Sequence, residues 1–91
     1  MANHKSALKR IRSSEKRRQR NRIVRGSTRT AVRKARLGIT GKDMAAAEVS
    51  VHEAVSALDK AAAKGVIHKN SAARRKSRLM RQLNQAKEVA A

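Results

Sequence analysis

The sequence lacks cysteine, proline, phenylalanine, tyrosine and tryptophan, and only 6 of its 91 residues are acidic. Without cysteine the chain forms no disulfide and has no thiol chemistry, so cysteine usage does not indicate a cellular compartment. Without proline, no interior position is barred from a helix by that residue. Without aromatic residues there is no platform on which the bases of a single-stranded nucleic acid could stack.

Long apolar stretches are also missing. No run approaches the ~20 residues of a membrane-spanning helix, and the opening MANHKSALKR has no apolar segment of the kind that marks a secretory signal. Arginine-rich presequences are a possible alternative, but the basic character returns at residues 69–81, which a removable presequence would not explain. We therefore expect a cytoplasmic protein.

Large aliphatic residues are few: Leu, Ile and Val together account for 16 of the 91 residues. This low content, combined with a net charge of +18, falls in the compositional range of disordered proteins. The abundant Ala, Arg, Lys, Gln and Glu favour a folded, helical chain instead, because they are strong helix formers. We expect a single all-α domain over residues 1–91 whose folding is completed when a partner binds.

Positive charge is concentrated at the start of the chain. Fourteen of the first 36 residues are Lys or Arg and only Glu15 is acidic, which gives +13, whereas residues 37–65 sum to −1 and residues 66–91 to +6. Such a density exceeds any need for solubility and cannot be buried against apolar side chains, so it indicates a polyanionic partner, a nucleic acid. Since aromatic residues are absent, recognition should rest on phosphates and on the shape of a folded RNA or a duplex.

Apolar periodicity predicts three helices, over residues 5–37, 43–63 and 70–88, joined by short turns as in an antiparallel three-helix bundle. Basic residues surround the first half of the first helix, where no apolar stripe exists, so this half should project beyond the bundle. The expected core stripes are Val24, Thr28, Ala31 and Ala35, flanked by Ile23 and Val32; then Met44, Ala47, Val51, Val55, Leu58 and Ala62; then Ala72, Lys76, Leu79, Leu83 and Ala86, flanked by Ala73 and Met80.

Turn chemistry marks the helix ends. Residues 38–41 read as a turn, with Thr40 and Asp43 resembling a capping box. Gly65 is expected in the left-handed conformation after the second helix, followed by Val66 and Ile67 packed on the core. Asn70 or Ser71 is expected to cap the third helix.

A second basic segment covers residues 64–78. There a turn places a helix N-terminus beside His68, Lys69 and Asn70, an arrangement suited to contacting a phosphate or a sugar, and Arg74, Arg75 and Arg78 follow on the helix surface. The alternative interpretation is simple capping plus a solvated basic face.

Catalytic chemistry has little support. His4, His52 and His68 lie in different segments without metal-ligand spacing, and Gly38 and Gly41 do not form a nucleotide-binding loop. We expect no enzyme activity, cofactor, metal or small-molecule substrate, and a monomer. Composition alone leaves open a DNA-compacting protein of the nucleoid or linker-histone kind. A membrane-active helix is disfavoured because the basic half lacks an apolar face.

The sequence resembles the family of the twentieth protein of the bacterial small ribosomal subunit. The resemblance is carried by Met-Ala-Asn-x-Lys-Ser-Ala-x-Lys-Arg-Ile-Arg at residues 1–12, by Glu-Lys-Arg-Arg-x-Arg-Asn at 15–21, and most strongly by residues 58–70 and 72–79. Residues 37–57 match only in character. The resemblance implies a three-helix bundle with a long first helix that binds 16S rRNA and joins the 5′ domain to the long penultimate stem during 30S assembly.

Motif positions of the family imply particular rRNA contacts. In the first basic segment they are Lys5, Ser6, Lys9, Arg10, Arg12, Lys16, Arg17, Arg18, Arg20 and Asn21, to which the run of basic residues adds Arg25 and Arg29. In the second segment they are His68, Lys69, Asn70, Arg74, Lys76, Ser77 and Arg78. Arg75 occupies a variable position of the family motif, so the resemblance assigns it no contact.

Overall fold

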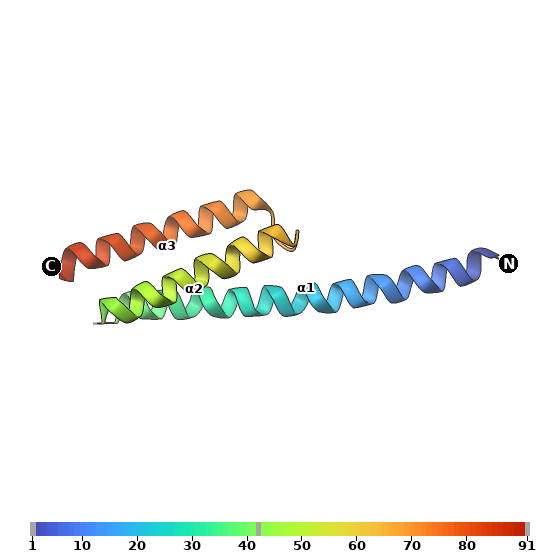
Figure 1. The fold of residues 1–91 in the computed structure, drawn as a ribbon, viewed down its shortest axis with the longest axis horizontal. Helices are drawn as coiled ribbons and strands as arrows, with labels where there is room; N and C mark the ends of the chain where they lie inside the picture. Colours follow the sequence, from blue (N-terminus) through green and yellow to red (C-terminus); the bar gives the residue numbers. More distant parts are fainter. Residues whose placement is uncertain (1, 42, 91) are drawn as a thin grey trace.

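The computed structural model describes residues 2–41 and 43–90, and the side chains of residues 5–41 and 43–89. Within these ranges the chain forms three helices and no strand: α1 (Ala2–Thr40), α2 (Met44–Ala63) and α3 (Lys69–Ala90). Consecutive helices run in opposite directions (Figure 1). The all-α class and the antiparallel helical bundle expected from the sequence are confirmed.

The molecule is elongated because α1 is much longer than the helices packed on it. Its principal extents are 70 × 20 × 13 Å and its radius of gyration is 18.2 Å, compared with about 12 Å for a compact chain of this length. The N-terminal half of α1 extends away from the other two helices (Figure 1). The projecting first helix is thus confirmed.

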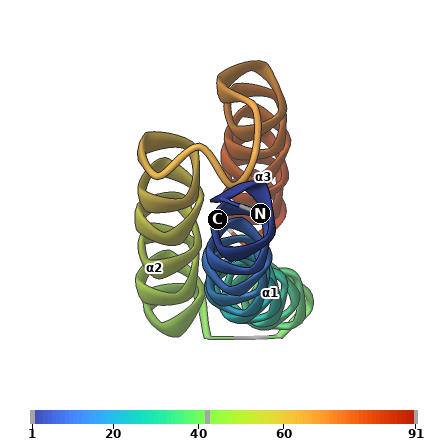
Figure 2. The ribbon, with the colours of Figure 1, turned by 90° about the vertical axis from the view of Figure 1, so that its right-hand side faces the viewer.

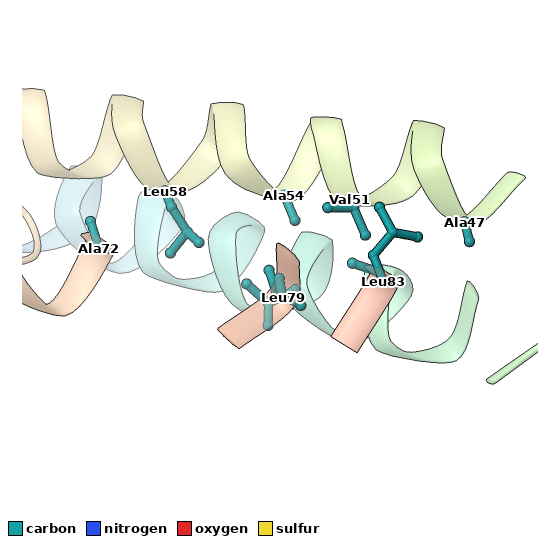
Figure 3. Close-up of a cluster of buried hydrophobic side chains, with 9 residues drawn as sticks. Ala47, Val51, Ala54, Leu58, Ala72, Leu79 and Leu83 are labelled. Atoms are coloured by element: carbon teal, nitrogen blue, oxygen red, sulfur yellow. The ribbon is translucent and has the colours of Figure 1, made fainter. Parts of the chain in front are cut away.

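The core is organised around α2, which packs on both other helices, whereas α1 and α3 contact each other least. Seen from the end, α2 lies to one side of both α1 and α3 (Figure 2). On α2 the buried residues recur at helical spacing: Ala47, Val51, Ala54, Leu58 and Ala61. They face Ala72, Leu79 and Leu83 of α3 (Figure 3) and Thr28, Val32 and Ala35 of α1.

Small residues make this core thin. Five of the ten buried apolar residues among the described side chains are alanine. At Gly38, an added Cβ would lie 3.4 Å from the Ala47 Cα, so the backbones of α1 and α2 approach closely there. Little apolar area is available to stabilise such a bundle, in keeping with the low aliphatic content.

Three residues expected beside the core stripes lie outside it. The side chain of Ile23 is 70% exposed, Ala73 is exposed, and Met80 is 42% exposed. Each follows a stripe residue directly or precedes one, and a step of one residue on a helix rotates a side chain by about 100°. The narrow core leaves these three positions outside it, whereas Val32, the fourth flanking residue, is buried.

The turn after α1 differs from the expected one. The helix continues through Thr40, whose Oγ1 donates to the Leu37 carbonyl oxygen within the last turn at 2.9 Å. Thr40 is therefore not an N-cap. Asp43 caps α2 by itself: its backbone is extended, and its Oδ1 accepts from the Ala46 N–H at 3.2 Å.

The turn between α2 and α3 contains the expected glycine. Gly65 has a φ of +75°. Its N–H donates to the Ala62 carbonyl at 3.0 Å and that of Val66 to the Ala61 carbonyl at 2.9 Å, the pair of hydrogen bonds that defines a Schellman motif. Ile67 packs on the core, as predicted, whereas Val66 is half-buried and lines a groove with residues of α1.

The prediction for the cap of α3 is wrong. The helix begins at Lys69, and His68 precedes it. The Nδ1 atom of His68 accepts from the Asn70 N–H at 3.1 Å, and the His68 carbonyl accepts from the Ala72 N–H at 3.1 Å. An imidazole thus performs the function expected of Asn70 or Ser71.

Candidate nucleic-acid interface

The N-terminal part of α1 is a helix without tertiary cover. Every side chain from Lys5 to Arg20 is exposed; we call residues 5–20 the arm. At 1.5 Å per residue the arm is about 24 Å long. Its eight cationic side chains are Lys5, Lys9, Arg10, Arg12, Lys16, Arg17, Arg18 and Arg20. They surround the helix axis, so the arm can approach phosphates from several directions.

A shallow hollow of about 480 Å³ lies along the arm and combines two kinds of donor. Its lining residues are Ser6, Lys9, Arg10, Ser13, Ser14 and Arg17. Hydroxyl and cationic groups are the side chains that proteins use most to bind phosphate oxygens. Ser13 and Ser14 were not among the expected contacts, although their place between basic residues could have indicated them.

Where the arm joins the bundle, a groove of about 550 Å³ brings two distant segments together. Arg17, Arg20 and Asn21 of α1 lie there with Lys64 of the α2–α3 turn, over the apolar side chains of Val24 and Val66. Three residues expected from the first basic segment thus converge with the second. Lys64 begins the second basic segment but was not among the expected contacts, because its polar neighbours on α1 lie 43 or more positions away in the sequence.

The second basic segment is only partly free to bind. His68, Lys69, Asn70, Arg74, Ser77 and Arg78 are exposed. The Nδ1 atom of His68 is engaged by the Asn70 N–H, which leaves Nε2 available. Lys76 differs from the others because its Nζ donates to Asp59 Oδ1 of α2 at 2.7 Å.

A third groove, of about 430 Å³, separates α1 from α3. It is lined by Arg29, Arg33 and Arg36 of α1, by Arg75 and Arg78 of α3, and by Val32. Arg29 and Arg78 were expected contacts, whereas Arg33 and Arg36 were missed. The signal existed in their spacing, because positions 29, 33 and 36 lie on one face of a helix.

Of the described side chains, the two acidic ones that form ion pairs, Glu48 and Asp59, lie on α2. Over the described side chains, the two ion pairs are Lys76–Asp59 and Lys87–Glu48, and both join α3 to α2. The hydrogen bond and charge of Lys87 lower the pKa of Glu48 from its ordinary value of 4.5. No ion pair in the described part joins α1 to either neighbour, so the positive charge of α1 is uncompensated within the fold.

The described residues hold no cluster of three or more His, Cys, Asp or Glu side chains that could bind a metal; the side chain of His4 lies outside them. In the same part of the chain, no helix has the length and apolarity to cross a membrane.

The three-helix fold and the positively charged surface place this chain in the class of small, basic, all-helical proteins. A family model described as ribosomal protein S20 matches residues 2–84, and the chain belongs to this family. It is accordingly a ribosomal, cytoplasmic structural component and not an enzyme, as the sequence indicated.

Curated relatives span most of the chain. The small ribosomal subunit protein bS20 of Thermomicrobium roseum is 54% identical over 84 residues, which cover 92% of this chain and 85% of the relative. The proteins of the same name from Geotalea uraniireducens and Corynebacterium diphtheriae are each 49% identical over 84 residues, covering 92% of this chain and 97% of the relative.

Proposed function

We propose that this protein is a constituent of the small ribosomal subunit that binds 16S rRNA directly and clamps rRNA domains together during 30S assembly. The observation that carries the proposal is the arm, a continuous helix in which every side chain from Lys5 to Arg20 is exposed. The relatives, each a small ribosomal subunit protein, support the same assignment. We take the 5′ domain and the long penultimate stem as the two RNA parts that are joined.

The mechanism follows from the arrangement of charges. Cationic side chains surround the arm, so it can enter between RNA strands and neutralise phosphates on more than one side. Each neutralised phosphate releases condensed counterions, which favours binding entropically and makes the affinity depend steeply on salt. The bundle sets the direction of the arm, since Thr28, Val32 and Ala35 fix the second half of the same helix against α2.

The second basic segment, residues 64–78, supplies the second set of contacts. His68, Lys69, Asn70, Arg74, Ser77 and Arg78 present donors beside the start of α3, where the helix dipole also favours an anion. Lys76 can hold its ion pair with Asp59 and contact RNA at the same time, because an ammonium has three N–H donors and Asp59 accepts from one of them. The protein functions here as a monomer within the ribonucleoprotein.

Binding to folded 16S rRNA should be compared with binding to random duplex DNA over a range of salt concentrations. Six or more phosphate contacts would give a slope of log K against log salt of roughly −5 or steeper. We expect a clear preference for the rRNA at moderate salt. Equal affinity for the DNA would instead support a DNA-compacting protein and reject the proposal.

A further inference from the structure

We infer that the groove between α1 and α3 is a further RNA site, which shares Arg78 with the second basic segment. In it, the backbone of one RNA segment is held by Arg29, Arg33, Arg36, Arg75 and Arg78. The inference rests on the proposed function, since it takes rRNA as the source of the phosphates. It adds a consequence for the fold: the RNA draws together the two helices of the bundle that contact each other least.

The groove is formed by the bundle and not by one helix. Its side walls are arginines from helices whose lining residues lie about 40 positions apart in sequence. Val32, only 8% exposed, lies between the α1 arginines and belongs to the core. A ligand in this groove would therefore contact side chains whose relative position depends on tertiary packing.

The charge of the groove has no internal counterpart. Both ion pairs of the described residues lie between α2 and α3, and the lining of the groove contains no acidic residue. Like charges closer than about 8–10 Å repel appreciably at physiological salt. Repulsion between the two arginine sets opposes contact of α1 with α3, and a polyanion placed between them would reverse this effect.

The chemistry of the lining favours a phosphate backbone over an acidic protein segment. All five cations are arginines, whose guanidinium groups bind phosphate oxygens in bidentate fashion. A protein partner would need an apolar anchor, and the one apolar lining residue, Val32, is almost fully covered. The volume of about 430 Å³ is in the range of sites that accommodate a drug-sized ligand, larger than a single phosphate.

The groove is separate from the arm. Arg12 in the middle of the arm and Arg33 in the groove are 21 residues apart on one helix, or about 30 Å. This distance exceeds the screening length, and neither side chain shares a neighbour with the other. The losses of binding free energy caused by substitutions at the two sites should therefore add.

The test compares two double variants of the full chain. Arg33→Gln/Arg75→Gln removes one arginine from each wall of the groove, and Lys34→Gln/Arg81→Gln removes the same charge from exposed positions of the same helices outside the lining. Affinity for folded 16S rRNA is measured as a function of salt. We expect the groove variant to lose at least about 10-fold in affinity and to lower the salt slope by roughly 2, and the control to lose less than about 3-fold.

Equal losses in the two variants would overturn the inference, because the groove would then act only through its net charge. This result differs from failure of the proposed function, in which the unmodified protein itself shows no preference for 16S rRNA. Competition by poly-glutamate as strong as competition by the rRNA at equal charge would assign the groove to an acidic protein and would also overturn it.

Thermal unfolding in inorganic tripolyphosphate gives a readout of the fold. Without the anion, the groove variant should be at least as stable as the unmodified chain, because repulsion is reduced. With tripolyphosphate, the unmodified chain and the control should gain more in Tm than the groove variant. If the groove variant loses its helical circular dichroism without anion, the arginines are structural residues and the inference is wrong.

Discussion

Residues 5–20 and residues 28–39 belong to the same helix, α1, but have different surroundings. In the first segment every side chain is exposed. In the second, Thr28, Val32 and Ala35 are buried against the bundle and Ile39 is partly covered. The backbone is helical in both, so helix geometry alone does not reveal what stabilises each half. Tertiary packing stabilises one half, whereas the other has only local propensity.

Local charge makes this difference larger. Arg12, Lys16 and Arg20 follow one another at i,i+4 spacing along the arm, and like charges at this spacing destabilise an isolated helix by a few tenths of a kcal/mol per pair. No acidic partner relieves this repulsion, since Glu15 takes part in no ion pair of the described side chains. We therefore expect the helix of the arm to depend on an external polyanion in solution, and the bundle half of α1 not to.

The largest expected effect concerns binding by the arm. Lys16→Gln/Arg17→Gln/Arg18→Gln/Arg20→Gln should weaken affinity for 16S rRNA by about 10³-fold, taking roughly 1 kcal/mol for each charge-assisted contact. The Tm should hardly change, because these side chains are exposed. Filter binding and a circular-dichroism melt measure the two quantities. Undiminished affinity would show that the arm is not the principal contact.

Two leucines test packing in the same comparison. Leu58 is fully buried and Leu8 in the arm is 44% exposed. Leu58→Ala should reduce the free energy of unfolding by about 3 kcal/mol, enough to unfold much of so small a bundle. Leu8→Ala should change it by less than about 0.5 kcal/mol. Similar effects of the two changes on thermal unfolding would contradict the division of α1 into two halves.

Amide hydrogen exchange resolves that division along α1. Without RNA, residues 5–20 should exchange with almost no protection, whereas residues 28–39 should be protected at least about 100-fold more, because they open only with the bundle. Bound 16S rRNA should bring the arm to comparable protection. If the arm is equally protected with and without RNA, its helix does not depend on the polyanion.

Two glycines should respond in opposite directions. Gly65 has a φ of +75°, where a side chain is strained, so Gly65→Ala should destabilise the bundle by about 1 kcal/mol. Gly26 lies inside α1 between the arm and the bundle, and an added Cβ meets no atom within 4 Å. Gly26→Ala should therefore stabilise the helix by about 1 kcal/mol. Denaturant unfolding of both variants measures these changes in the free energy of unfolding. Changes of equal sign would contradict the different backbone roles given to Gly65 and Gly26.

The smallest effect is electrostatic and lies in the bundle. Lys87 holds the pKa of Glu48 below its ordinary value of 4.5 in the folded state, first by its hydrogen bond and then by its charge. A depressed pKa contributes stability that is present above the unfolded pKa and is lost as the pH falls through the folded pKa. In an NMR titration of the Glu48 carboxyl, Lys87→Gln should raise this pKa toward 4.5. An unchanged titration would remove Lys87 as the cause.

Much of the fold follows from local rules that the sequence displays. Ala47, Val51 and Leu58 were expected on the buried face of α2 and are buried, although Ala54 and Ala61 are buried more fully than the expected Val55 and Ala62. Gly65 after the apolar run predicts the Schellman turn. The errors arise where several polar residues compete for one position. Asp43 and His68 are the caps, not Thr40 and Asn70, because a cap depends on which side chain reaches a free N–H once the helix ends are placed.

The sequence by itself determined the helical class, the three-helix order, the ribosomal family and the excess of positive charge at the start of the chain. These properties depend on composition, on short-range periodicity and on motifs read along the chain. Only the tertiary structure decided which charges converge. It places Lys64 beside Arg17 and Asn21, and Arg75 and Arg78 across from Arg33 and Arg36. Contacts between residues distant in sequence depend on the distance between the helices and on the rotation of each helix about its axis. The thin, alanine-rich core sets that distance and rotation only when all three helices are packed together.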